Sequence, residues 1–161
     1  MSTETVRPPR NPPPWFVHTA WRVHRAIHRL SGRRFLWAPS DKRGWGALHL
    51  TAVGRTSGQE RGVILGYLED GPDLALLAMN GWDEGHPDWW LNLEANPDAT
   101  VRLAGQEPRR MRAHTATGAE RDRLWALWAE AEPTLDAHAD HRTTETPVMI
   151  LEPVVGNQLP T

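Results

Sequence analysis

The stretch ALHLTAVGRTSGQERGVILGYL, residues 47–68, places two apolar runs on either side of a polar loop. Both runs are short, contain β-branched residues and are flanked by glycine, which is typical of strands. The loop GRTSGQERG between them, residues 54–62, holds hydroxyl side chains and two arginines. A plain hairpin turn does not need these residues. The stretch therefore predicts two antiparallel strands joined by a ligand-binding loop.

The residue types in this loop suit an anion. Gly54 and Gly58 permit tight turns and a close approach of the backbone. Arg55 and Arg61 carry guanidinium groups that match the oxygens of phosphate or carboxylate groups. Hydroxyl and backbone N–H donors between them could complete an anion-binding nest. The alternative interpretation is a solvated hairpin turn without a ligand.

The chain after this hairpin alternates between strand and helix patterns. Asp70-Gly71 marks the turn into a third strand. HPDWWLNLEANP predicts a short helix, and TGAERDRLWALWAEAEP predicts a longer helix with a capping box of Thr117 and Glu120. We expect a mixed α/β, mainly β fold: a small barrel of about six antiparallel strands with an N-terminal helix and two or three inserted helices. The expected strands are residues 46–54, 62–71, 73–80, 99–105, 107–116 and 146–153.

The first 45 residues differ from the rest in charge. They hold nine Lys and Arg side chains against Glu4 and Asp41, a net charge of +7, whereas the remainder carries −9. An anionic partner would suit this basic segment, and attraction between the two parts of the chain is the alternative. The expected organisation is a disordered tail (1–14), a basic amphipathic N-terminal helix and linker (15–45), the barrel domain (46–153) and a tail (154–161).

The predicted N-terminal helix carries Trp15 and Trp21 among its arginines. A basic helix with tryptophans can lie on an anionic membrane surface, or it can pack on its own domain. The chain contains no run of 18 apolar residues, so no membrane span is predicted, and no secretory signal is expected. The cytoplasm, with a possible peripheral membrane contact, is therefore the expected location.

Composition argues against several classes of chemistry. The chain has no cysteine, which excludes disulfides, thiol nucleophiles and Cys-zinc sites. It has no G-x-S-x-G elbow for a serine nucleophile. The histidine pairs His24/His28 and His138/His141 are interpreted as solvated side chains, so no metal is expected. The nine tryptophans are not interleaved with the arginines on one platform, so no nucleic acid is expected.

Six blocks stand in a fixed order along the chain: LTAVGRTSGQER, EDG, AMNGW, PDWWLNLEANP, ERDRLWALW and TPVMILEP. With this order and spacing the chain resembles the deazaflavin (F420)-dependent nitroreductase and quinone reductase family, a branch of the split β-barrel flavin and deazaflavin oxidoreductases. The resemblance covers residues 48–153, and PDWWLNLEANP is its most specific block. It implies a split β-barrel of the FMN-binding type and reduced coenzyme F420, an 8-hydroxy-5-deazaflavin with a phosphate and an oligoglutamate tail.

The resemblance assigns the opening loop to the phosphate of F420. Arg33 and Arg34, with the basic pair that follows them at 42–43, would meet the oligoglutamate tail. Backbone groups after the loop would border the deazaflavin ring. The implied cofactor-binding residues are Arg55, Thr56, Ser57, Arg61, Val63, Ile64, Leu65, Met79, Asn80, Gly81, Trp89, Trp90, Asn92, Lys42 and Arg43.

The implied acceptor pocket departs from the family pattern. Its expected residues are Gly66, Met79, Trp82 and Leu135. All but the tryptophan stand where the family has polar or aromatic residues, which predicts a broad, apolar preference for quinones and enones over nitroimidazoles. The family's tyrosine near the C-terminus is missing, so His138 or His141 could donate the proton, and no other catalytic residue is assigned.

We therefore expect an enzyme that transfers a hydride from reduced F420 to an electrophilic organic acceptor, such as a quinone, an enone or a nitro compound. The cofactor carries the hydride chemistry, and the protein supplies orientation and a dry pocket. Two alternatives stay open: an FMN-dependent oxidoreductase with the same barrel, and a non-catalytic barrel that binds the cofactor or a lipid-like ligand. The oligomeric state also stays open.

Overall fold

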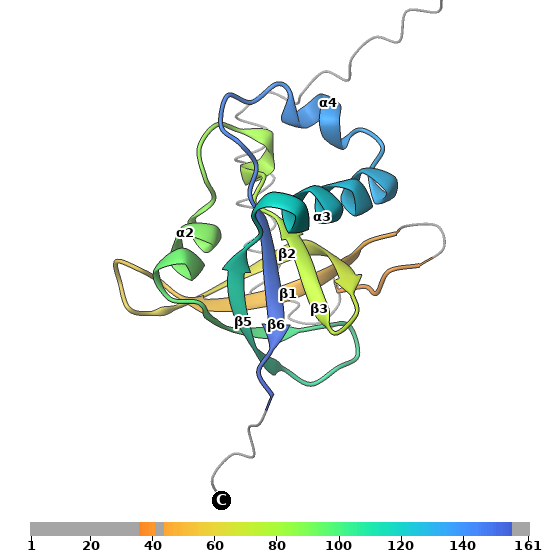
Figure 1. The fold of residues 1–161 in the computed structure, drawn as a ribbon. Coiled ribbons are helices and arrows are strands. Elements are labelled where there is room, and N and C mark those ends of the chain that lie inside the picture. The colour runs from red at the N-terminus through yellow and green to blue at the C-terminus, as the bar shows by residue number, and fades with distance from the viewer. Residues whose placement is uncertain (1–35, 41–43, 156–161) are drawn as a thin grey trace, which may run out of the picture.

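The computed structural model describes residues 36–40 and 44–155, so the predicted N-terminal tail and basic helix, with Lys42 and Arg43, lie outside the described residues. Six strands form one closed antiparallel barrel in the order β1-β2-β3-β6-β5-β4, which confirms the predicted fold (Figure 1). Within the described ranges, no helix is long and apolar enough to cross a membrane. The strands are β1 (Gly46–Val53), β2 (Glu60–Asp70), β3 (Asp73–Leu77), β4 (Asp98–Arg102), β5 (Arg109–Thr115) and β6 (Val148–Pro153). The helices are η1 (Asn80–Trp82), α2 (Asp88–Ala95), α3 (Gly118–Ala131) and α4 (Leu135–Ala139).

Strand β1 closes the barrel because it pairs on both of its edges. Residues 60–67 of β2 pair with one edge of β1, and β4 pairs with the other. Only residues 68–70 of β2 pair with β3. Along residues 60–67, the edge of β2 that faces away from β1 therefore has no partner among the described strands. This part of β2 offers backbone N–H and C=O groups that the barrel does not use.

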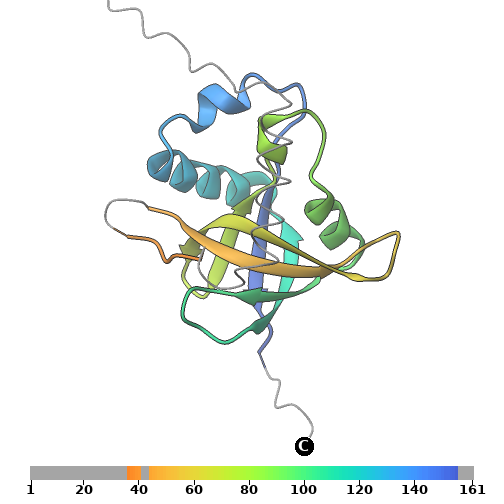
Figure 2. The same ribbon diagram turned by 180° about the vertical axis from the view of Figure 1, so that it is seen from behind.

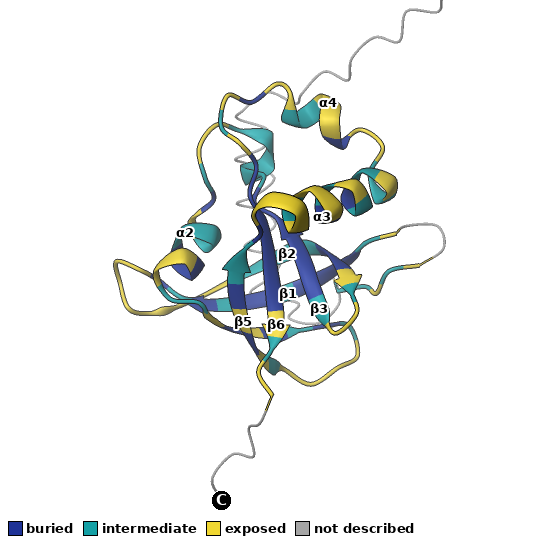
Figure 3. Cartoon of the chain, in the orientation of Figure 1, coloured by how far each residue is buried: buried dark blue, intermediate teal, exposed yellow. Residues whose placement is uncertain are grey.

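Alternate residues of each strand fill the barrel interior. In β1, Leu48, Leu50 and Ala52 belong to the buried core, whereas Thr51 between them is only half-buried. Helix α2 adds Leu93 to the same core, which holds this helix against the barrel. Figure 3 shows the strands as a mostly buried layer. A fully buried leucine contributes roughly 1.5–3 kcal/mol relative to an exposed one, so this core is the main support of the site.

Helices α3 and α4 cover the outer face of β2, β3 and β6. Leu68, Ala75 and Ile150 of these strands form a second buried cluster with Leu124 of α3 and Leu135 of α4. Figures 1 and 2 show α3 lying across the strands with α4 beyond it. Strands covered on both faces are apolar without interruption, which explains the continuous apolar run LALL, residues 74–77, in β3.

The predicted capping box of α3 is wrong. Thr117 occupies the N-cap position, but its side chain makes no capping hydrogen bond. Oε2 of Glu120 instead lies 3.3 Å from Nε2 of His114 on β5. The chain enters the helix through Gly118, whose φ of +56° favours glycine. The Glu120 carboxylate therefore connects the helix to the sheet and does not accept the hydrogen bond of a capping box.

Candidate active site

Arg55 joins the β1–β2 loop to helix α2. Oδ1 of Asn92 accepts hydrogen bonds from the backbone N–H of Arg55 at 3.1 Å and from its Nη1 at 3.0 Å. Nη2 of Arg55 donates to Oδ1 of Asp88 at 3.1 Å. Asn92 is only 6% exposed, so an unpaired side chain there would be costly. The blocks GRTSGQER and PDWWLNLEANP thus form one structural unit, and both terminal nitrogens of Arg55 are engaged within the protein.

The other donors of this loop face the solvent. Arg61, Thr56 and Ser57 are exposed. Nη2 of Arg61 lies 3.5 Å from Oγ of Ser57, which also accepts from the backbone N–H of Gln59 at 3.2 Å. A Cβ at Gly54 would stand 2.7 Å from the same hydroxyl, which explains the glycine. This set of guanidinium and hydroxyl donors fits a phosphate group.

Val63, Ile64 and Leu65 lie on the part of β2 that follows the loop. On one side they pair with β1, and on the other side they meet none of the described strands. Val63 and Leu65 pack partly buried against the barrel core. A planar ring with carbonyl and N–H groups along its edge could bind such a strand edge by the hydrogen bonds that another strand would make. The geometry is compatible with the predicted place beside the deazaflavin ring, which stays a prediction.

Residues 80–82 follow β3 in a strained conformation. The φ angles are +51° at Asn80, +64° at Gly81 and +65° at Trp82. At a non-glycine residue such a backbone costs on the order of 1–3 kcal/mol and persists only where the surroundings hold it. The carbonyl oxygen of Met79 accepts from the backbone N–H of Trp82 at 2.8 Å. Strain of this kind clusters at functional sites, and here it lies in the segment predicted to border the cofactor.

Trp82 stacks on His138 of α4. The ring centroids are 5.4 Å apart, with an interplanar angle of 30°. Nδ1 of His138 lies 2.8 Å from the carbonyl oxygen of Thr134, so Nδ1 must donate, and Nε2 is the nitrogen that can face a ligand. The structure thus brings together Trp82 of the predicted acceptor pocket and the predicted proton donor His138. The other candidate donor, His141, is exposed beyond the end of α4.

Two residues of the predicted acceptor pocket lie in packed surroundings. A Cβ at Gly66 would stand 3.4 Å from Cε3 of Trp45 and 3.6 Å from Cη2 of Trp128. Leu135 is fully buried in the cluster beneath α3 and α4. Contact between an acceptor and either position would require this packing to move. The other two members of the predicted pocket are only partly buried.

Trp89 and Trp90 of α2 both pack against the barrel core. Nε1 of Trp90 donates to Oγ1 of Thr115 at 3.1 Å, and Thr115 in turn donates to Glu94. The ring of Trp90 lies 4.5 Å from the ring of His86. Trp90 is therefore held in place by the protein itself, and a contact between either tryptophan and the cofactor stays a prediction.

A polar cluster that no sequence pattern predicts lies between the segment before α2 and the segment before β6. Both carboxylate oxygens of Glu84 accept hydrogen bonds from Thr143 and Thr144. These bonds, first from the Thr143 backbone and then from the Thr144 hydroxyl, lower the pKa of Glu84 to about 2. Arg142, only 8% exposed, donates from Nη2 to the carbonyl oxygen of Gly85 at 2.6 Å. The partners are separated by 57 to 60 residues, so no local periodicity connects them.

The barrel and its helices match a known family. The model of the F420H2-dependent quinone reductase family matches residues 32–153, which contain every described strand and helix. The chain belongs to the F420H2-dependent quinone reductase family. The predictions of this family, of an oxidoreductase and of F420 as its cofactor are confirmed.

Individual relatives agree with this assignment. An F420H2-dependent quinone reductase of Mycobacterium tuberculosis is 30% identical over 139 residues, which cover 81% of this chain and 87% of that protein. The solved F420H2-dependent reductase FDR-A is 31% identical, with a TM-score of 0.60 over 66% of this chain and 93% of that chain. A solved domain-swapped dimer is 27% identical, with a TM-score of 0.61 over 84% of this chain and 99% of its own.

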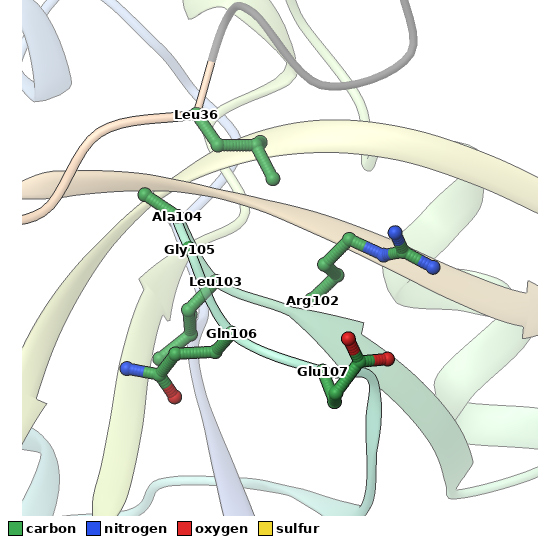
Figure 4. Close-up of a pocket in the computed structure, with 7 residues that line it drawn as sticks. All are labelled: Leu36, Arg102, Leu103, Ala104, Gly105, Gln106 and Glu107. Carbon is green, nitrogen blue, oxygen red and sulfur yellow. The ribbon is translucent and has the colours of Figure 1, made fainter.

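A cavity of about 170 Å³ lies at the turn between β4 and β5 of this F420H2-dependent quinone reductase family member. Figure 4 shows Leu36 above Ala104 at one side of the cavity, with Arg102 and Glu107 at the other. None of its lining residues belongs to the predicted cofactor or acceptor set. We therefore do not assign this cavity to the reaction.

Proposed function

We propose that this chain reduces a quinone with a hydride taken from reduced F420. The observation that carries the proposal is the unit of the β1–β2 loop and α2, which presents anion-binding donors next to the edge of β2 that no described strand covers. A cofactor with a planar ring and a phosphate-bearing tail requires both features side by side. Membership in the F420H2-dependent quinone reductase family supports the same conclusion.

The loop residues would hold the phosphate of the cofactor. Arg61, Thr56 and Ser57 supply exposed guanidinium and hydroxyl donors, while Arg55 keeps the loop on α2. Each charge-assisted hydrogen bond to the phosphate is worth about 1.5–3 kcal/mol. Backbone groups of residues 63–65 would border the ring, which leaves its reacting face toward the acceptor.

The acceptor would lie beside residues 79–82. Trp82 offers a flat aromatic face, and Met79 offers a flexible apolar one. When bound, reduced F420 supplies the hydride, and a quinone that gains this hydride and one proton becomes a hydroquinone. His138 would donate the proton from Nε2 in its protonated form, because Nδ1 is bound to the Thr134 carbonyl and the ring lies against Trp82.

Acceptor selectivity tests this proposal. With saturating reduced F420, we expect menadione to be reduced and nitroimidazoles to be reduced poorly or not at all, because apolar contacts discriminate by shape rather than by hydrogen bonding. The measurement is kcat/KM across an acceptor panel, with FMN titrated in parallel. Strong turnover of a bicyclic nitroimidazole without quinone activity would contradict the proposal. Tight F420 binding without turnover of any acceptor would indicate a carrier.

A further inference from the structure

We infer that Glu84 and Arg142 are positioning residues that hold the acceptor side of the site in place. With Thr143 and Thr144 they form what we name the Glu84 clasp. The inference rests on the proposed quinone reduction, which assigns the stacked pair of Trp82 and His138 to the acceptor. The clasp connects the segment that follows the tryptophan with the segment that follows the histidine.

Glu84 receives four hydrogen bonds from two consecutive residues. The backbone N–H groups of Thr143 and Thr144 donate at 2.7 and 3.0 Å, and their hydroxyl groups donate at 3.0 and 2.7 Å. The flanking backbone is linked as well, because the N–H of Gly85 donates to the Thr144 hydroxyl at 3.1 Å. Nδ2 of Asn80 donates to the carbonyl oxygen of Glu84 at 2.9 Å. A continuous path of hydrogen bonds thus leads from the segment before β6 to η1.

Arg142 completes the connection from the buried side. Its Nη2 donates to the carbonyl oxygen of Gly85, and its Nη1 donates to the hydroxyl of Thr146, both at 2.6 Å. Burial lowers the pKa of this guanidinium, and the charge of Glu84 opposes that effect. A buried arginine without a direct carboxylate partner is costly, so hydrophobic packing alone does not explain its position. Its geometry suits a connector between two loops.

The segment that the clasp holds is the strained one. Asn80 and Trp82 keep φ angles of +51° and +65°, although neither is glycine. A backbone of this kind relaxes unless surrounding contacts oppose the relaxation. The Glu84 clasp provides such contacts from two to four residues away, and the stacking of Trp82 on His138 provides another. Loss of the clasp should therefore release η1 and separate the two rings.

The carboxylate side of the clasp lies outside the hydrophobic core. Glu84 and Thr143 are exposed, and neither belongs to one of the two buried clusters. Its loss should leave the barrel folded while residues 79–86 become more mobile. A displacement of about 1 Å between reacting groups can cost on the order of 100-fold in rate. The effect should therefore appear in catalysis with the acceptor, with little effect on cofactor binding or on global unfolding.

Substitutions in the clasp test the inference. Glu84→Ala removes the carboxylate that accepts all four hydrogen bonds. Thr144→Val removes a hydroxyl while it keeps the side-chain shape. We expect kcat/KM for menadione to fall roughly tenfold or more in both variants, with the Kd for reduced F420 within about twofold of the wild-type value. Thr144→Ser keeps the hydroxyl and should restore kcat/KM. Glu145→Ala is the matched control, because this exposed residue lies in the same segment and pairs with Arg121 at 3.0 Å.

Hydrogen–deuterium exchange gives a readout that does not depend on activity. Residues 79–86 should exchange faster in Glu84→Ala, while the barrel strands exchange as in the wild type. Unchanged exchange with an unchanged kcat/KM would overturn the inference, and so would a parallel decrease in F420 affinity, kcat/KM and thermal stability. If the wild-type protein binds F420 but reduces no quinone, the proposed function fails. In that case faster exchange still supports the clasp, and unchanged exchange overturns it.

Discussion

Two arginines of the β1–β2 loop differ in their surroundings. Arg55 places both terminal nitrogens on α2, where Asn92 and Asp88 accept its hydrogen bonds. Arg61 is exposed and has one long contact to Ser57. We therefore expect Arg61 to be the better phosphate ligand, whereas Arg55 shapes the loop that carries the other donors.

Arg61→Ala should weaken the binding of reduced F420 by about 1.5–3 kcal/mol, the value of a charge-assisted hydrogen bond. Thermal unfolding should not change, because the side chain is exposed. Fluorescence titration measures the affinity, and Arg110→Ala, at an exposed arginine of β5, is the matched control. Equal affinities of the wild type and Arg61→Ala would remove the phosphate-binding role from this residue.

Asn92→Leu should reduce stability and cofactor affinity together. It removes the oxygen that accepts both hydrogen bonds from Arg55, and we expect a loss of about 1–3 kcal/mol in the free energy of unfolding. A displaced loop should then bind F420 less tightly. A double-mutant cycle with Arg55→Ala measures the coupling between the two side chains, and the effects of the two substitutions should be non-additive. Additive effects would show that this contact does not orient the loop.

Among the described elements, the strands and two of the four helices, α2 and α3, can be predicted from the sequence. Alternation in β1 and the turn at Asp70-Gly71 are strong local signals. Pro87 and Pro97 bracket α2 closely. Helix α4 has only five residues, too few for a periodic pattern, so it cannot be predicted in this way.

The polar contacts between elements cannot be predicted in the same way. A guanidinium group fits protein carboxylates and amides as well as phosphate, so the partners of Arg55 are not readable from the loop. Glu84 is bound by two threonines that lie 59 and 60 residues further along the chain. Glu120 bonds to His114 on β5 in place of the capping N–H that its spacing indicates. Each outcome depends on which groups the fold brings together.

An ion pair ties α3 to the end of β2 and has a predictable pH dependence. Arg123 donates from Nη1 and Nη2 to the two oxygens of Asp70 at 2.9 and 2.8 Å, which lowers the pKa of Asp70 below its usual 3.8. Because the folded pKa lies below the unfolded one, the stabilisation is complete above about pH 5 and is lost as the pH falls through the folded pKa. The Tm of Asp70→Asn should lie below that of the wild type at neutral pH.

The two Tm values should converge in strong acid, where Asp70 is protonated in both states of the wild type. Asp122→Asn, at an exposed position of the same helix, controls for the loss of a surface charge. A difference between Asp70→Asn and the wild type that persists in strong acid would mean that the ion pair is not its source.

At the scale of the whole molecule, charge is divided along the chain. Residues 1–45 carry +7, and the remaining residues carry −9. The second part alone would repel a cofactor with a phosphate and several glutamates. We therefore expect the attraction to come from the loop arginines and from the basic segment, most of which lies outside the described residues.

The affinity for F420 should rise with the number of glutamates in its tail and fall with salt, because exposed charges are screened over about 8–10 Å at moderate ionic strength. Replacing Lys42 and Arg43 together by Ala should reduce both dependences. Titration of cofactors with different tail lengths at two salt concentrations measures them. A tail-free cofactor that binds equally well regardless of salt would assign the basic segment to another partner, such as an anionic membrane surface.

The edge of β2 without a described strand partner matters for protein molecules that have not yet bound a cofactor. Along residues 60–67 it meets no described strand, and an edge of this kind recruits any extended backbone, which is how sheets grow into aggregates. Glu60 and Arg61 put charge at one end of this edge, but the residues that follow are apolar. A cofactor ring bound along this edge would prevent it from pairing with a strand of another molecule. We therefore expect more aggregation when the protein is synthesised faster than the cofactor is supplied.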